Sequence, residues 1–293
     1  DDNIFVGSEA GYTNTVGVSN LCFGTQAGYT NLDGDYNTFI GKQSGYANTT
    51  GDNNTAIGYK AGYTGTSGGK NISLGTEAGY SNSTGSGNVN LGYNSGYYNT
   101  GSYNLFMGYE SGKRNTSGLN NVFLGYQAGS TLGSPGSYQQ GDYNVFVGNK
   151  SGYSNTSGNR NLFIGYNSGY TNTTGSRNIF IGESSGKNNL GGEENIFIGM
   201  GVGGNDTGVG YSNTSGSRNA FIGFKSGNKN TEGSNNIFFG SEAGELNTTG
   251  DKNIYIGYRA ARSSLTSTNN INIGNQAGRN NELGSYNIYM GYL

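Results

Sequence analysis

The chain has 293 residues, of which 31% are hydrophobic and 12% are charged, with a net charge of −2 and no His or Trp. This balance excludes a basic track for nucleic acids and a polyanionic tail, and no apolar run approaches the length of a membrane-spanning helix. The single cysteine, Cys22, cannot form an internal disulfide, and we interpret it as a small apolar side chain.

A fixed period organises the sequence. The motif Asn-x-x-x-Gly recurs every 17 residues, apart from one interval of 16 and two longer ones of 23 and 24. Such self-similarity is the signature of a repeat architecture, in which each unit is stable only when stacked on its neighbours. We number each repeat, here called a coil, from its opening Asn, and the openings are Asn3, Asn20, Asn37, Asn54, Asn71, Asn88, Asn104, Asn121, Asn144, Asn161, Asn178, Asn195, Asn219, Asn236, Asn253, Asn270 and Asn287.

The residue types within a coil predict two short strands and two tight corners. Positions 2–4 hold β-branched and aromatic residues, as in NIFIG, and positions 8–10 hold a small residue, Gly and often Tyr. Positions 12–16, as in NTTGS, supply turn chemistry, and the frequent glycines disfavour helix. The chain is therefore predicted to be an all-β parallel β-solenoid, or β-roll, of about seventeen 17-residue coils. We expect one repeat domain over residues 1–293, uncapped at both ends, which is either a fragment of a longer array or a subunit that stacks end to end.

Strand alternation divides the side chains of positions 2–4 between two sides, with positions 2 and 4 on one side and position 3 on the other. Position 4 is apolar in every coil, and we assign it to the core, with the small residue of position 8 facing it. The predicted core residues are Val6, Phe23, Ile40, Ile57, Leu74, Leu91, Met107, Leu124, Val147, Ile164, Ile181, Ile198, Ile222, Phe239, Ile256, Ile273 and Met290.

With position 4 inside, the mostly aromatic position 3 must face outward. The result is an apolar stripe larger than a soluble monomer normally leaves in water. We therefore expect another subunit to cover it, and the predicted interface residues are Phe5, Phe39, Phe106, Phe123, Phe146, Phe163, Phe180, Phe197, Phe221 and Phe238.

Asn, Gly and Tyr form further columns along the repeat. The opening Asn is predicted to form a ladder in which each side-chain amide bonds to the copies above and below, beginning with Asn3, Asn20, Asn37, Asn54 and Asn71. The glycines of positions 5 and 9 are expected to adopt positive φ or to allow close backbone approach at corners. Tyr at position 10 either stacks from coil to coil or presents a row that could bind sugars or a partner.

Two insertions enlarge the loops near residues 129–143 and 203–218. Loops of a repeat array often carry its binding function, so Pro135, Tyr138, Asn205 and Asp206 are candidate binding residues. Simple tolerance of insertions is an equal alternative. The Asn-x-Ser/Thr sequons of the repeats are better explained as turns than as glycan sites.

No arrangement of residues in the sequence predicts catalysis. Without His there is no Ser-His-Asp or Cys-His pair and no His/Cys metal cluster, and acidic side chains do not recur from coil to coil. We therefore expect a protein that is not an enzyme and that uses no cofactor or metal.

The segments NTFIG, NLFIG and NIFIG, each followed by a small residue and Gly, resemble the coils of the YadA-like head domains of trimeric autotransporter adhesins. Similar Gly/Asn-rich repeats occur in the shafts of trimeric phage tail fibres. The resemblance covers nearly the whole chain. It implies a left-handed parallel β-roll, three chains around one axis, and exposure at a cell or virion surface for attachment.

These observations together predict a structural and adhesive fibre segment, extracellular or at a cell surface, that self-associates as a homotrimer or an end-to-end filament. Its further partner would be an unknown surface receptor or glycan, with no nucleic acid and no membrane insertion. One alternative is a phage tail-fibre shaft that binds a receptor. Another is an ice-binding or carbohydrate-binding solenoid, for which Thr15, Thr49, Thr100 and Thr116 form a row in the turns.

Overall fold

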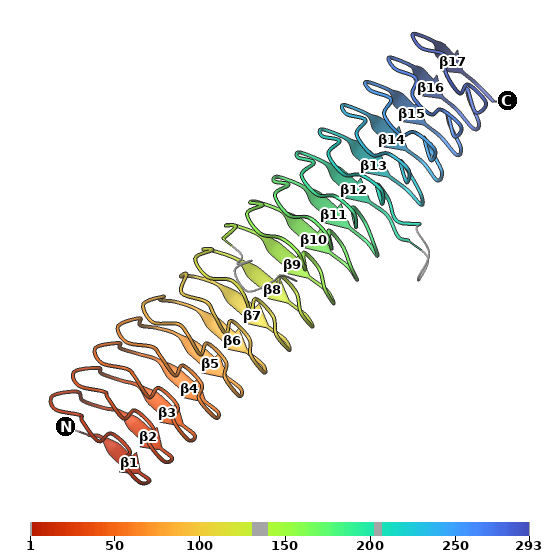
Figure 1. The fold of residues 1–293 in the computed structure, drawn as a ribbon. Helices are drawn as coiled ribbons and strands as arrows, with labels where there is room; N and C mark the ends of the chain where they lie inside the picture. The colour runs from red at the N-terminus through yellow and green to blue at the C-terminus, as the bar shows by residue number, and fades with distance from the viewer. Residues whose placement is uncertain (1, 131–139, 202–206, 293) are drawn as a thin grey trace. The chain divides into compact units, whose positions relative to one another are not determined.

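The computed structural model describes residues 2–130, 140–201 and 207–292, and in this part of the chain it shows an all-β parallel β-solenoid without helices (Figure 1). The predicted fold class is thereby confirmed. The chain divides into two compact units, residues 1–144 and 145–293, here called the N-terminal and C-terminal units.

Each coil contributes one strand of three residues at positions 2–4. In the N-terminal unit the strands are β1 (Ile4–Val6), β2 (Leu21–Phe23), β3 (Thr38–Ile40), β4 (Thr55–Ile57), β5 (Ile72–Leu74), β6 (Val89–Leu91), β7 (Leu105–Met107) and β8 (Val122–Leu124). In the C-terminal unit they are β9 (Val145–Val147), β10 (Leu162–Ile164), β11 (Ile179–Ile181), β12 (Ile196–Ile198), β13 (Ala220–Ile222), β14 (Ile237–Phe239), β15 (Ile254–Ile256), β16 (Ile271–Ile273) and β17 (Ile288–Met290).

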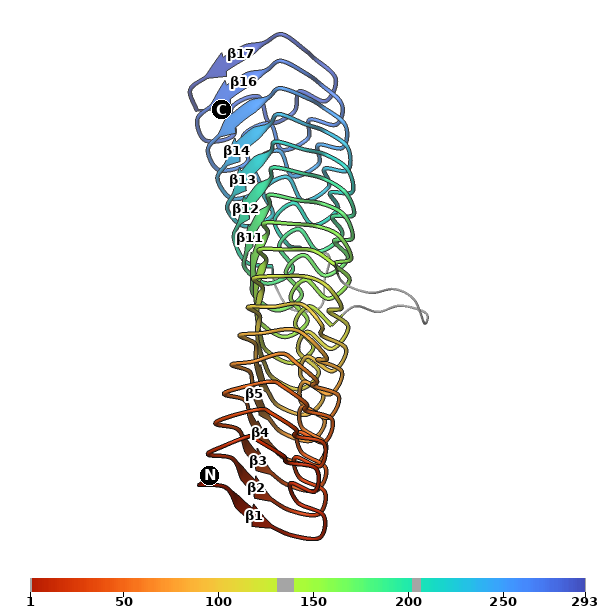
Figure 2. The ribbon, with the colours of Figure 1, turned by 90° about the vertical axis from the view of Figure 1, so that its left-hand side faces the viewer.

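Successive strands within each unit pair in parallel and in register. Phe163 of β10, for example, lies opposite Phe180 of β11, so identical positions of neighbouring coils meet. The second insertion leaves this register intact, because Phe197 of β12 still pairs with Phe221 of β13 across a coil that is seven residues longer. In each unit the strands lie above one another along one wall of the coils, and turns form the remaining walls (Figure 2).

The second short strand predicted at positions 8–10 is wrong. The chain there forms turns, and the coils are joined by single backbone hydrogen bonds such as Gly28 N–H to Ser44 O at 2.9 Å. The residues before and within this segment explain why: the glycines of positions 5 and 9 have φ near +130° and +58°, and position 7 is also left-handed. Three residues of positive φ within five positions do not fit an extended strand, although the predicted positive φ of the two glycines is confirmed.

The assignment of inside and outside on the strand is also wrong. Position 3 faces the interior: Phe39, Phe106, Phe123, Phe146, Phe163, Phe180, Phe197, Phe221 and Phe238 are buried, while Phe5 lies in the first coil and is 37% exposed. Position 4 faces outward, and Val6, Phe23, Ile40, Ile57, Leu74, Leu91, Met107, Leu124, Val147, Ile164, Ile181, Ile198, Ile222, Phe239, Ile256, Ile273 and Met290 are all partly or largely exposed.

The reason for the reversal lies in the width of the coil. The interior receives one side chain from each strand, and a Phe ring reaches across it to lie against the glycine of position 9. A Cβ at Gly169 would collide with the ring of Phe163, so the glycine makes the space that the ring fills. The rings stack on one another along the coils, with 4.7 Å between the ring centroids of Phe163 and Phe180. The small residues of position 8 face this interior, as predicted, and Ala27 and Ser44 are buried.

Candidate interaction surface

The first and third residues of the strands form two outward columns, which we call the aliphatic face. In β2–β16 every one of them is partly or largely exposed. Only Thr38 and Thr55 carry a polar side chain. The face consists of Ile4, Val6, Leu21, Phe23, Thr38, Ile40, Thr55, Ile57, Ile72, Leu74, Val89, Leu91, Leu105, Met107, Val122 and Leu124 in the N-terminal unit, and of Val145, Val147, Leu162, Ile164, Ile179, Ile181, Ile196, Ile198, Ala220, Ile222, Ile237, Phe239, Ile254, Ile256, Ile271, Ile273, Ile288 and Met290 in the C-terminal unit.

The size of the aliphatic face follows from strand geometry. Neighbouring strands lie about 4.8 Å apart, and two side chains that share a face of a strand, taken with their own width, cover about 10 Å. The eight strands of the N-terminal unit then present roughly 400 Å² and the nine of the C-terminal unit slightly more. Each value reaches the range of about 300–600 Å² that the largest apolar patch of a typical monomer covers.

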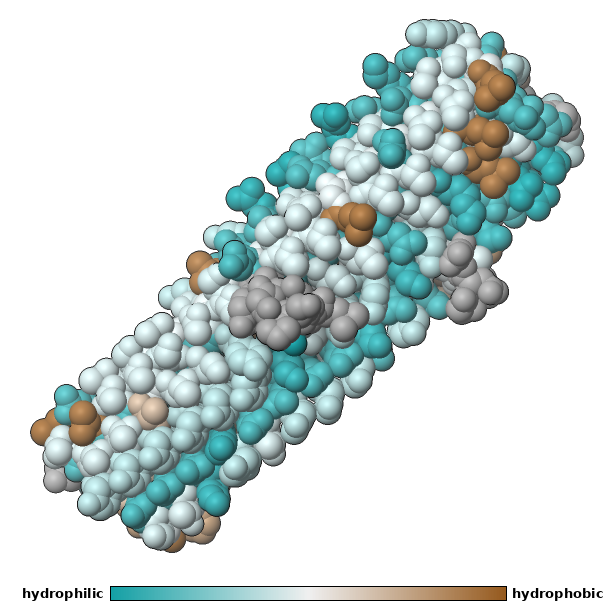
Figure 3. Space-filling view, in the orientation of Figure 1, coloured by the Kyte–Doolittle hydropathy of each residue, from teal (hydrophilic) through white to brown (hydrophobic). Residues whose placement is uncertain are grey.

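The remaining surface of the coils has a different character. Figure 3 shows a face on which polar and near-neutral residues predominate and hydrophobic residues form only isolated groups. Gly, Ser, Thr, Asn and Tyr of the turns account for this composition. The strands therefore present continuous columns of apolar side chains, whereas the turns present mostly polar side chains with only scattered apolar ones.

The tyrosines of position 10 stack from coil to coil. In the N-terminal unit Tyr12, Tyr29, Tyr46, Tyr63, Tyr80 and Tyr97 form one continuous stack with ring centroids 4.7–5.2 Å apart. Burial, together with the nearby Glu77 carboxylate, raises the pKa of Tyr97 to about 12. Because neighbouring rings cover one another's faces, the column offers a ligand mainly ring edges and hydroxyl groups.

Position 10 becomes charged towards the end of the C-terminal unit. Arg262 lies 2.6 Å from Glu245 of the preceding coil, and Arg259 of position 7 lies 2.7 Å from Glu242. Lys225, one coil earlier, lies 3.7 Å from Glu245. The hydrogen bond from the Arg259 guanidinium lowers the pKa of Glu242 below its usual value. Ion pairs between neighbouring coils thus take the place of stacked rings here.

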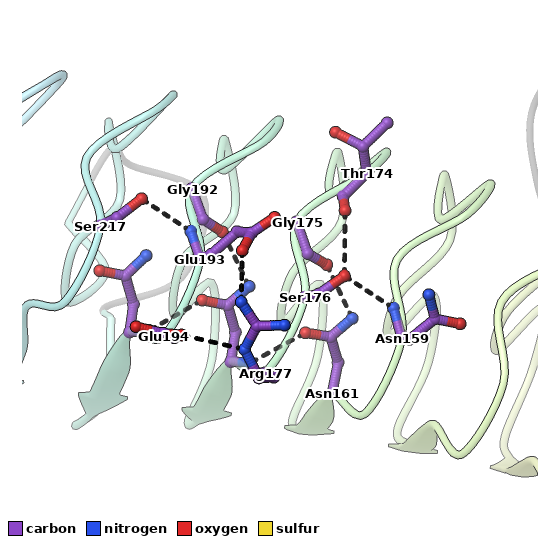
Figure 4. Close-up of polar contacts among 12 residues, drawn as sticks. Asn159, Asn161, Thr174, Gly175, Ser176, Arg177, Gly192, Glu193, Glu194 and Ser217 are labelled. Atoms are coloured by element: carbon purple, nitrogen blue, oxygen red, sulfur yellow. Dashed lines mark hydrogen bonds and ion pairs between the residues drawn. The ribbon is translucent and has the colours of Figure 1, made fainter.

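The opening Asn forms a ladder, but with a different set of bonds from the one predicted. The Oδ1 atom of each Asn accepts the backbone N–H of the next opening Asn, as in Asn178 N–H to Asn161 Oδ1 at 2.9 Å. Its Nδ2 group donates to a glycine carbonyl of its own coil, as in Asn161 to Gly175 at 2.8 Å (Figure 4). Asn3, Asn20, Asn37, Asn54 and Asn71 follow this pattern. The side-chain amide therefore links the backbones of neighbouring coils. A direct hydrogen bond between two opening Asn side chains is added only at some steps, such as Asn71 to Asn54.

A second column of polar side chains, at positions 16 and 17 of the coils, is shown in the same view. The Ser176 hydroxyl accepts the backbone N–H of Asn159 at 3.0 Å and donates to the Thr174 carbonyl at 3.2 Å (Figure 4). Beside it, Arg177 forms ion pairs with Glu193 at 2.6 Å and Glu194 at 3.1 Å. The bond between Asn159 and Ser176 and the ion pairs of Arg177 join neighbouring coils, and the side chains of the ion pairs are about half exposed.

Sequence reasoning missed a third polar column, the asparagines of position 12, which we call the inner Asn column. Here the side-chain amide does donate to the Asn of the preceding coil, for example Asn189 Nδ2 to Asn172 Oδ1 at 2.7 Å, and also to the carbonyl of the glycine three residues later. The recurrence of Asn-x-x-Gly at positions 12–15 was the available signal. Several sequon asparagines, including Asn48, Asn172 and Asn247, belong to this column and are buried, so they are not open to glycan attachment in the folded chain.

The remaining sequence candidates are Cys22, a possible metal cluster and the residues of the two loops. Cys22 is buried in the column of Phe rings, and burial raises its pKa to about 12. Among the described residues no group of three or more His, Cys, Asp or Glu side chains could hold a metal ion. Pro135, Tyr138, Asn205 and Asp206, the candidate binding residues of the loops, lie outside the described residues.

No protein-family model matches the chain, and no characterised protein matches it in sequence. Within the described ranges there is also no helix of the length and apolar character that a membrane span requires.

Proposed function

We propose that this chain is a segment of an extracellular surface fibre that self-associates and mediates attachment without catalysis. The observation that carries the proposal is the aliphatic face, which is continuous within each unit and nearly free of polar atoms. The largest apolar patch on a monomer is often functional, and we assign this one to an interface. The resemblance to trimeric adhesin heads and phage fibre shafts supports three chains around one axis, at a cell or virion surface.

A second copy of the same chain is the partner that best fits this face. The strands of each unit offer roughly 400 Å² of apolar surface, about half of the area that one partner contributes to a standard protein interface. The face repeats the same side chains at the same spacing in each coil, so a copy presents a surface of matching chemistry and period. It bears no charged residue that would favour an oppositely charged partner.

The structure also bears on the alternatives. The hydroxyls of Thr15, Thr49 and Thr100 donate to backbone carbonyls of the next coil, so they do not form a row of free hydroxyls for ice. The stacked tyrosines leave no ring face open for a sugar within the stack. Self-association through the strands therefore has more support than either binding function.

Measurement of the native mass by multi-angle light scattering over a range of concentrations tests the proposal. We expect the wild type to be oligomeric and the double variant Ile179→Lys with Ile181→Lys, which places charge on the aliphatic face, to dissociate. Thr174→Lys in the exposed turn of the same region is the matched control and should retain the wild-type mass. A wild type that stays monomeric at high concentration, or a double variant that assembles like the control, contradicts the proposal.

A further inference from the structure

An internal cavity lies in the N-terminal unit where two of the stacked columns are interrupted at once. The column of Phe rings ends at Phe39 and continues as Ala56 and Ser73 in the next two coils. The inner Asn column is interrupted at Gly65, between Asn48 and Asn82. The centre of a water molecule can occupy a volume of about 20 Å³ in this cavity. All of these residues line it.

The walls of this cavity carry polar groups that lack the partners present in other coils. Elsewhere the amide of one inner Asn donates to the Oδ1 atom of the preceding one, as Asn48 does to Asn31. Because residue 65 is glycine, Asn48 Oδ1 receives no such donor, and Asn82 Nδ2 keeps only its bond to the Gly85 carbonyl at 3.1 Å. Asn82 Oδ1 is buried without a hydrogen-bond partner, and Ser73 Oγ has only a long contact of 3.5 Å with Asn90.

We infer that this cavity is a binding site for internal water, which takes the place of the amide missing at Gly65. A water molecule needs about 10–15 Å³ of such volume and two to four polar partners. The cavity meets both conditions, because Asn48 and Ser73 supply oxygen atoms and Asn82 supplies an N–H group. The apolar surroundings of Phe39 and Ala56 leave these polar groups with few other ways to form hydrogen bonds.

A high-resolution crystal structure of the wild type, compared with two variants of Gly65, tests the inference. A Cβ at residue 65 has no neighbour closer than 3.4 Å, and its φ is not positive, so the site accepts a side chain. We expect electron density for water within hydrogen-bond distance of Asn48, Ser73 or Asn82 in the wild type and in Gly65→Ala. In Gly65→Asn the new amide should displace the water, bond to Asn48 and Asn82, and raise the unfolding midpoint above that of Gly65→Ala.

A wild-type cavity without density overturns the inference. So does a Gly65→Asn structure in which the water remains and the new side chain turns towards solvent. The wild-type map can overturn the inference by itself, so the test does not depend on the folding of the variants.

Discussion

Adjacent residues on β10 allow a direct test of which side of the strand faces the core. Phe163 is fully buried, and its ring lies 5.0 Å from that of Phe146 and 4.7 Å from that of Phe180. Phe163→Ala removes this ring and leaves a cavity, at a cost of about 3–5 kcal/mol in the free energy of unfolding. Ile164 points the other way and is 37% exposed. Ile164→Ala should therefore cost about 1 kcal/mol or less in the isolated chain.

The comparison is best made by urea unfolding followed by circular dichroism at low protein concentration, where assembly through the aliphatic face is weakest. Hydrogen exchange of the β10 amides then shows whether the loss of stability is local, since each coil contacts mainly its neighbours. At higher concentration the cost of Ile164→Ala should grow, because that side chain belongs to the proposed interface. A cost for Ile164→Ala at low concentration that equals or exceeds that of Phe163→Ala would refute the orientation of the strand.

Three further predictions concern other columns of the fold. Cys22 is buried and its thiol has a raised pKa, so we expect a thiol reagent such as 5,5′-dithiobis(2-nitrobenzoate) to label it only after unfolding. Rapid labelling of the native chain would contradict its place in the core. The pKa of Glu242 is lowered by Arg259, so this pair stabilises the fold at neutral pH and loses that effect as the pH falls below about 4. The difference in the free energy of unfolding between wild type and Glu242→Gln should therefore shrink between pH 7 and pH 3. A difference that stays constant over this range would exclude the ion pair as its cause. Ala56→Phe extends the column of rings beside Phe39 and should raise the free energy of unfolding by about 1–2 kcal/mol in thermal melts. A variant less stable than the wild type would show that this coil has no room for a ring.

The period of the sequence was sufficient to predict the architecture. Asn-x-x-x-Gly at intervals of 17 residues placed the first strand of each coil, and the structure has a strand at positions 2–4 of every coil. The second insertion was placed in the loop after positions 8–10, and β12 and β13 on either side of it pair in register. Such success is possible because stacking requires each coil to present equivalent residues at equivalent positions.

The direction of the side chains could not be decided from the strand alone. Three residues alternate as out, in, out or as in, out, in, and both patterns place apolar residues on both sides. The preference for aliphatic cores favoured the wrong choice. Position 3 offered a better signal, because its non-aromatic residues are all smaller than Phe and fit a closed space, whereas position 4 varies among large side chains up to Phe239. These non-aromatic residues are Cys22, Ala56, Ser73, Asn90 and Asn272.

The second strand was predicted wrongly because the sequence does not reveal the backbone conformation of position 7. Position 7 adopts positive φ with residues such as Gln26, Lys60 and Glu242, which carry no sequence signal for that conformation. The stacked neighbours impose it, and local propensity does not reveal it.

The in-register pairing of equivalent residues has a consequence for how such a chain can change over generations. Because each coil meets its neighbours through the same columns, a recombination event that removes or duplicates one whole coil joins two surfaces that already fit. The deletion of a single residue before Asn104 and the longer loops of two other coils show that smaller changes are absorbed at the corners. Length is therefore the property of this molecule that gene duplication and loss can alter most freely, with the stacking contacts of the surviving coils preserved.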